Sequence, residues 1–120
     1  MAYLRNITID QGTTFSTGFV VTDANGDVVD LTNHQFQAQL RKSYVTSTYA
    51  SFTVNVVDAI NGEITLELSA EQSMNLRYGR YVYDVVMQDD SSVTTRVVEG
   101  IATITPKVTT WVTTTTTQLG

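Results

Sequence analysis

Three aspartates in the segment TDANGDVVD come nearest to the pattern of a metal site: Asp23, Asp27 and Asp30. Carboxylate oxygens are ligands that Ca²⁺ prefers, but an EF-hand loop needs them at fixed positions and has a glutamate at its twelfth. This segment has neither that spacing nor that glutamate. Aspartates in turns commonly accept hydrogen bonds from nearby backbone amides. We therefore expect turn aspartates here, with no metal site and no cofactor.

Acid–base or nucleophilic catalysis would have to involve His34, the one histidine of the chain. It lies beside Asn33 in a polar stretch, and no serine–histidine–acid arrangement can be argued around it. Other carboxylates are expected to be solvated charges of strands, a helix or a turn: Glu63, Glu67, Glu71, Asp89 and Asp90. The sequence predicts no catalytic residue, and we expect the chain not to be an enzyme.

Aromatic side chains are the candidates for binding. Tyr44 and Tyr49, in KSYVTSTYAS, could stack on the faces of sugars, or they could shield a loop over the core. Near the end of the chain, TTWVTTTTTQLG contains Trp111, Val112 and Leu119 as its large apolar residues. A tryptophan in a pocket is a typical energetic anchor of a protein interface. We expect these five residues to contribute to an assembly interface.

Composition and charge limit the classes of partner. Twelve acidic and seven basic residues give a net charge of −5. Nucleic acids and anionic membranes both favour a basic face, so neither is an expected partner. The chain contains no cysteine, which excludes disulfides and thiolate metal sites. The opening residues MAYLRNITID hold no long apolar run, so we expect no signal peptide and no transmembrane helix.

Alternation of apolar and polar residues predicts the strands that would position these side chains. In HQFQAQLRK, Phe36, Ala38 and Leu40 point to one side and the glutamines to the other, as in a strand with one solvated face. FTVNVVD and EITLEL repeat the pattern, whereas both faces of RYVYDVVMQ are fairly apolar, which places that strand centrally. TFSTGFVVTD and VTTRVVEGIATIT complete the set, and we expect Gly100 in the latter to mark a bulge.

Turn and cap signals separate the predicted strands. Asn-Gly pairs at 25–26 and 61–62 supply the positive φ that tight hairpins need, and residues 89–92 form a third turn signal. In SAEQSMNLRYG, Ser69 is predicted to cap a short helix near residues 70–76, with Gln72 as its capping-box partner. Gly79 is expected to end that helical turn.

About seven short strands in a chain of this length predict an all-β fold, an immunoglobulin-like antiparallel β-sandwich; a small closed barrel is the alternative. Phe36, Leu40, Leu66 and Val85 should lie in one core between two sheets. The alternating pattern stops near Pro106. We therefore divide the chain into a sandwich domain, residues 1–106, and an extended C-terminal tail, residues 107–120.

Three stretches carry motifs in a characteristic order: TFSTGFVVTDANGDVVDLTNHQFQAQLRKSY, NGEITLELSAEQSMNLRYGRYVYDVV and TRVVEGIATITPKVT. The first holds the corner NGDVVDLT and a strand ending in RKS. The second runs from GEITLELS through a short helix to GRYVYD, and the third closes with GIATITPKVT. In this order the motifs resemble the immunoglobulin-like structural proteins of tailed bacteriophages, among them the amino-terminal domains of baseplate and receptor-binding-apparatus proteins. The resemblance spans about residues 7 to 109.

The resemblance implies a non-enzymatic virion structural protein that is assembled in the host cytoplasm. Its partners would be other virion proteins or copies of itself. Attachment to the tail or baseplate is the first expectation, and decoration of the capsid is the alternative. A carbohydrate-binding module that stacks sugars on Tyr44, Tyr49 and Trp111 is a further alternative.

The C-terminal tail has a composition suited to pairing with another chain. Its five successive threonines have high strand propensity and no partner strand of their own. An added strand gains affinity from main-chain hydrogen bonds and specificity from alternate side chains. We therefore expect residues 107–120 to add as a strand, or to lie as an extended arm, on a neighbouring subunit; a solvated terminus is the alternative.

Overall fold

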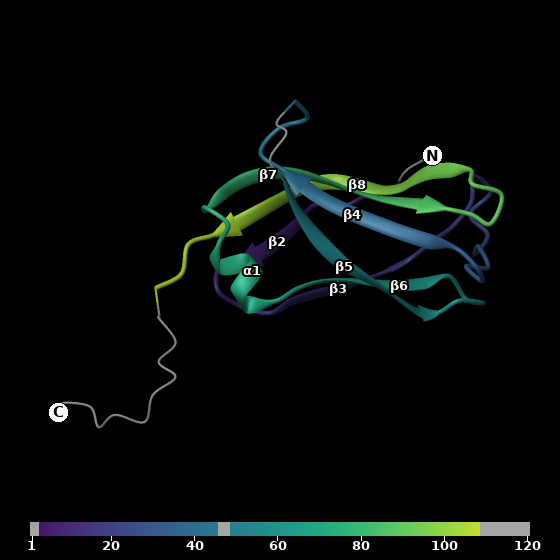
Figure 1. Ribbon diagram of the computed structural model, residues 1–120, viewed down its shortest axis with the longest axis horizontal. Helices are drawn as coiled ribbons and strands as arrows, with labels where there is room; N and C mark the ends of the chain where they lie inside the picture. The colour runs from purple at the N-terminus through teal and green to yellow at the C-terminus, as the bar shows by residue number, and fades with distance from the viewer. Residues whose placement is uncertain (1–2, 46–48, 109–120) are drawn as a thin grey trace, which may run out of the picture.

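The computed structural model describes residues 3–45 and 49–108, which are built almost entirely of strands (Figure 1). Along the chain lie β1 (Tyr3–Leu4), β2 (Ile7–Asp10), β3 (Phe15–Val20), β4 (Gln35–Arg41), β5 (Tyr49–Asp58), β6 (Glu63–Leu68), α1 (Ala70–Met74), β7 (Gly79–Gln88) and β8 (Thr94–Thr105). The strands pack in two layers, with α1 between them at one end. The predicted all-β sandwich with one short helical turn is therefore confirmed.

One curled sheet supplies both layers, because β5 takes part in each. Residues 49–52 of β5 pair with β4, and residues 53–58 pair with β6. The strand order is β1-β8-β7-β4-β5-β6-β3, and β2 also pairs with β8. One layer thus holds β1, β2, β8, β7 and β4, and the other holds β6 and β3 (Figure 1).

The N-terminal strands depart from the expected antiparallel pairing. Both β1 and β2 run parallel to β8, while β3 through β8 pair with one another in antiparallel fashion. Parallel neighbours need a long connection. Here the whole domain between β2 and β8 supplies it. The sheet is therefore mixed, and the first and last strands of the domain lie side by side.

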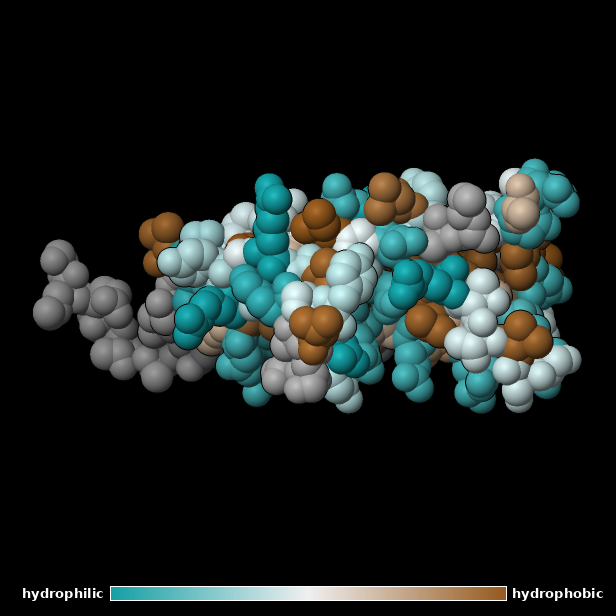
Figure 2. Space-filling model, turned by 90° about the horizontal axis from the view of Figure 1, so that it is seen from above, coloured by the Kyte–Doolittle hydropathy of each residue, from teal (hydrophilic) through white to brown (hydrophobic). Residues whose placement is uncertain are grey.

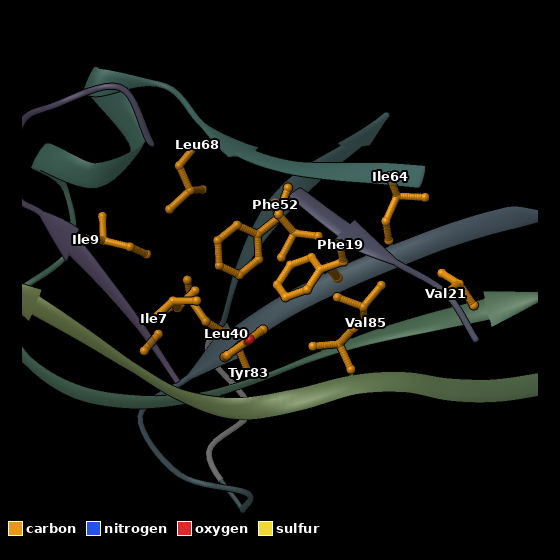
Figure 3. Packing of buried hydrophobic residues seen from close by; sticks show 14 of the residues in the cluster. Ile7, Ile9, Phe19, Val21, Leu40, Phe52, Ile64, Leu68, Tyr83 and Val85 are labelled. Atoms are coloured by element: carbon orange, nitrogen blue, oxygen red, sulfur yellow. The ribbon is translucent and has the colours of Figure 1, made fainter. Parts of the chain in front are cut away.

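The core lies between the two layers, where side chains from both point toward one another (Figure 3). Leu40, Leu66 and Val85 are fully buried, as their alternation predicts. Phe36 is partly buried and packs against the same cluster. The core thus draws on β4 and β7 of one layer and β6 of the other, which confirms that one core lies between two layers.

A close contact between the N-terminal segment and β8 fixes how the two ends of the domain meet. A Cβ atom on Gly100 would collide with the carbonyl oxygen of Arg5 and would lie 2.7 Å from the carbonyl carbon. The Arg5 N–H donates to the carbonyl of Glu99 at 2.9 Å, and the Tyr83 hydroxyl donates to the carbonyl of Arg5 at 2.5 Å. Burial raises the pKa of Tyr83 to about 12. We call Arg5, Tyr83 and Gly100 the N-terminal latch.

The expected bulge at Gly100 is wrong. Gly100 faces Tyr83 in unbroken register, and the register shifts earlier in β8, at Val97. The glycine is required because the backbone of Arg5 approaches too closely for a side chain. A glycine within a predicted strand is typical both of a bulge and of a close backbone approach. Only the position of the N-terminal strands distinguishes the two.

Helix α1 begins as the sequence predicts and ends differently. The Ser69 hydroxyl accepts from the Gln72 N–H at 3.1 Å, and the Gln72 side chain accepts from the Ser69 N–H at 2.9 Å, which completes the capping box. The helix ends at Met74, followed by Asn75 as a right-handed C-cap. The expectation that Gly79 ends the helix is therefore wrong, since Gly79 has φ of +134° and begins β7.

Replacing Leu40 with alanine should lower the free energy of unfolding by about 2–4 kcal/mol, because a fully buried side chain leaves a cavity. Gln39→Ala, on the opposite face of β4, should change it by less than about 0.5 kcal/mol. Denaturant titration of both variants measures the difference. A loss for Leu40→Ala as small as that of the control would mean that the inward face of β4 is assigned wrongly.

Gly100→Ala tests the N-terminal latch. The added methyl group should displace the backbone of Arg5, which overpacks the site at a cost of about 1–3 kcal/mol. Gly18→Ala is the matched control, because its Cβ would meet only the carbonyl oxygen of Ile64 at 3.7 Å. Hydrogen exchange should also show a less protected Arg5 amide in Gly100→Ala. Equal stability of the two variants would contradict the latch.

Candidate functional site

A groove of about 650 Å³ lies where β4, β5 and the chain around α1 meet. It is lined by Leu40, Arg41, Lys42, Tyr49, Ala50, Ser51, Gln72, Asn75, Leu76, Arg77 and Tyr81. We call it the basic groove, because three of its lining residues are cationic and none is acidic. In a chain with a net charge of −5, such a concentration of positive charge marks a surface that would favour an acidic partner.

Cations and aromatic rings are paired along the basic groove. The guanidinium carbon of Arg41 lies 5.1 Å from the centre of the Tyr49 ring, and Nζ of Lys42 lies 4.9 Å from that of Tyr81. Each cation is attracted by the negative face of its ring. The Tyr81 hydroxyl also donates to the carbonyl of Arg77 at 2.7 Å. The rings therefore hold the charged groups in place, and one face of each ring is occupied.

Hydrogen bonds join the helical wall of the groove to the rest of the sandwich. Nε2 of Gln72 donates to the carbonyl of Ser51 in β5 at 3.2 Å. Nε2 of Gln11 donates to the carbonyl of Leu76 at 2.8 Å. Both ends of this wall are therefore tied to other elements of the sandwich.

The outer face of β4 and β7 carries a second, more polar surface. Two adjoining hollows of about 280 and 340 Å³ share Gln39, Asp84 and Val86. Arg96 lies 3.2 Å from Asp84 and 3.7 Å from Glu99 across this surface. Seen from above the view of Figure 1, hydrophobic side chains stand singly among hydrophilic ones (Figure 2). This face lacks the cationic character of the basic groove.

The structure separates the tyrosines that the sequence proposes for binding. Tyr44 is 72% exposed and lines the hollow beside Asp84, whereas Tyr49 is 52% exposed and lines the basic groove. Arg41 is the one residue that lines both hollows. The other interface candidates, Trp111, Val112 and Leu119, lie outside the described residues.

The aspartates of the first turn accept hydrogen bonds from nearby backbone amides. Oδ1 of Asp23 accepts from the N–H groups of Asn25 and Asp27, and Oδ1 of Asp30 accepts from the N–H and hydroxyl of Thr32. The bonds from Thr32 lower the pKa of Asp30. Among residues 3–45 and 49–108, no three side chains of the His, Cys, Asp or Glu type are grouped to hold a metal ion.

His34 lies apart from the basic groove, at the far end of β4. Its Nδ1 lies 2.9 Å from the carbonyl oxygen of Thr32, within the same turn. The position matches a histidine that helps to shape a corner.

Sequence reasoning missed the basic groove, although part of its signal was present. RKS ends β4, and Arg77 lies shortly before β7. Both cationic segments reach the same end of the sandwich only because β4 and β7 are antiparallel neighbours. That pairing, once predicted, would have placed Arg41, Lys42 and Arg77 close together.

None of the helices in the part of the chain that the structure describes has the length and apolar character needed to cross a membrane.

Comparison with known proteins gives a likeness of fold. No family model matches the chain, and no curated protein matches it. The solved N-terminal domain of phage TP901-1 ORF48 is similar, with a TM-score of 0.52 and 13% identity over 83% of this chain and 84% of that chain. The internalin-like protein lmo2027 of Listeria monocytogenes gives a TM-score of 0.43 at 15% identity, over 88% of this chain and 28% of that one. A family 123 glycoside hydrolase from Clostridium perfringens gives a TM-score of 0.39 at 11% identity, over 88% of this chain and 23% of that one. The phage domain therefore shares this fold over most of both chains.

Calcium should not stabilise the protein. Asp23 and Asp30 already cap backbone amides of their turns, and they are too few and wrongly spaced for a closed oxygen cage. Thermal unfolding with calcium and with a chelator should therefore give the same midpoint. A rise of several degrees on adding calcium would overturn this assignment.

Proposed function

We propose that this chain is a non-enzymatic structural protein of a tailed bacteriophage particle, held on the tail or baseplate by protein–protein contacts. The observation that carries the proposal is the shared fold with the N-terminal domain of phage TP901-1 ORF48, which covers 83% of this chain and 84% of that domain. The order of sequence motifs supports the same context. Such a protein would be made in the host cytoplasm and would end up in the virion.

The surfaces of the sandwich supply contacts of the kind that protein docking uses. The basic groove combines cations with apolar and aromatic walls, and Tyr and Arg side chains are typical of interface hot spots. Arg41 and Lys42 each cover one face of a neighbouring tyrosine ring, which leaves less aromatic surface for stacking a sugar. These features favour a protein partner over a carbohydrate. Binding of the protein to a glycan array would support the carbohydrate alternative instead.

Quantitative mass spectrometry of purified particles tests the proposal and the site of attachment. We expect the chain to copurify with intact particles in roughly a few to dozens of copies, as the symmetry of a tail or baseplate would require. On the order of hundreds of copies would instead favour decoration of the capsid. Absence of the chain from purified particles would contradict the proposed role altogether.

The C-terminal tail is proposed to carry part of the attachment, and its removal tests this. Deleting the residues after Thr105 should leave the melting midpoint nearly unchanged, because the buried core residues lie between Ile7 and Ile104. The same deletion should abolish incorporation into particles, since an added strand or arm would be lost. Incorporation is measured by complementing a phage that lacks the gene.

Single substitutions in the tail refine this test. Trp111→Ala should weaken incorporation in the same direction as the deletion, because a tryptophan is a typical interface anchor. Thr115→Ala is the matched control within the threonine run and should have little effect. Normal incorporation of the truncated protein would show that the tail is not an attachment arm.

A further inference from the structure

The two ends of the sandwich carry opposite charge. Strands β3, β5 and β7 end where β4, β6 and β8 begin, so the connections between them lie together at one end. Seven of the twelve carboxylates of the chain lie in these connections: three in residues 20–34, two in 57–63 and two in 88–94. The same three segments contain no Lys or Arg. We call this the acidic end. Five of the seven cations lie toward the other end, Arg41, Lys42, Arg77, Arg80 and Lys107, where they outnumber the three carboxylates Asp10, Glu67 and Glu71.

Turn formation explains only part of this segregation. Asp23, Asp30, Asp58 and Asp89 accept hydrogen bonds from backbone amides of their own turns. The need for turn aspartates accounts for their presence, but it does not account for the lack of Lys and Arg in the same three segments. Furthermore, the carboxylates of Glu63 and Asp90 accept no hydrogen bond within the described residues, so they are available to pair with an external cation.

An apolar side chain stands at the tip of the acidic end. Ile60, in the turn between β5 and β6, is 72% exposed and lies between Asp58 and Glu63. The turn is closely packed: Gly62 has φ of +69°, a Cβ atom there would lie 2.9 Å from the carbonyl oxygen of Val21, and the Val21 N–H donates to the carbonyl of Gly62 at 2.8 Å. An apolar tip flanked by carboxylates complements an apolar groove flanked by cations.

We propose that copies of this chain associate head to tail, with the acidic end of one copy seated in the basic groove of the next. The occupant is a second copy because one molecule carries both halves of the contact. Their charges are opposite, and both contain apolar side chains. The two surfaces lie at opposite ends, so the contact is heterologous and leads to a ring or an open row rather than a two-fold dimer. A turn seated in a groove buries little surface, which predicts weak association. The inference concerns the purified chain alone and does not depend on the proposed virion role.

Sedimentation velocity over a range of concentrations tests the association. At about 20 mM salt, where charges act over about 20 Å, the wild-type chain should form dimers and larger species as concentration rises. At about 300 mM salt the apparent dissociation constant should increase about tenfold or more. A chain that stays monomeric under all these conditions would overturn the proposal, and would leave a foreign acidic protein as the candidate occupant of the groove.

Charge reversal at each end separates local docking from the effect of net charge. Lys42→Glu with Arg77→Glu changes the net charge from −5 to −9, and Glu63→Lys with Asp90→Lys changes it to −1. Each double variant alone should be monomeric, and an equimolar mixture should regain association, because one supplies an intact acidic end and the other an intact groove. General repulsion predicts instead that the variant nearest neutrality associates most strongly.

Two further results bear on the same contact. Ile60→Ala should raise the apparent dissociation constant several-fold. Leu4→Ala is the control and should not raise it, because Leu4 is 70% exposed on β1, away from both ends. Thermal unfolding of every variant confirms that it is folded. A mixture of the two double variants that remains monomeric, or double variants that associate like the wild type, would overturn the proposal.

Discussion

The contact of the Arg5 backbone with Gly100 is the constraint on which the rest of the sandwich depends. It seats the N-terminal segment beside β8, where the Tyr83 hydroxyl bonds to the carbonyl of Arg5. The Arg5 side chain then reaches the other layer: Nη1 donates to the carbonyl of Gly18 at 3.3 Å, and the guanidinium carbon lies 5.1 Å from the centre of the Phe19 ring. One residue thus joins β8 to β3, so the two layers are held together along the side where no strand passes between them.

This arrangement could be predicted from the sequence only in part. The inward faces of β4, β6 and β7 follow from alternation, and the start of α1 follows from Ser69 and Gln72, because both signals are local. The parallel pairing of β1 and β2 with β8 could not be predicted, since it joins residues about a hundred positions apart and leaves no periodic pattern. The sequence therefore predicts a bulge at Gly100, whereas this glycine accommodates a distant backbone. The basic groove was missed for the same reason, because Lys42 and Arg77 come together only through the pairing of β4 with β7.

The same strand order decides which surfaces are left for partners. Because consecutive strands from β3 to β8 run in opposite directions, every second connection falls at the same end of the sandwich. The acidic turns are gathered at one end, and the cations around α1 at the other. A small structural module with two different ends can make two different contacts at once, which suits a component that is repeated within a larger particle. The virion role proposed above would use both ends in this way.

The most direct test of this account is a cryo-EM reconstruction of intact particles at a resolution that shows side chains. A docked structural role predicts density for a two-layered sandwich at the tail or baseplate, closed by the Arg5–Gly100 contact, with other protein chains packed against its surface. Particles in which no such sandwich can be found, in a preparation known to contain the chain, would contradict the central claim that it is a docked structural component of the virion.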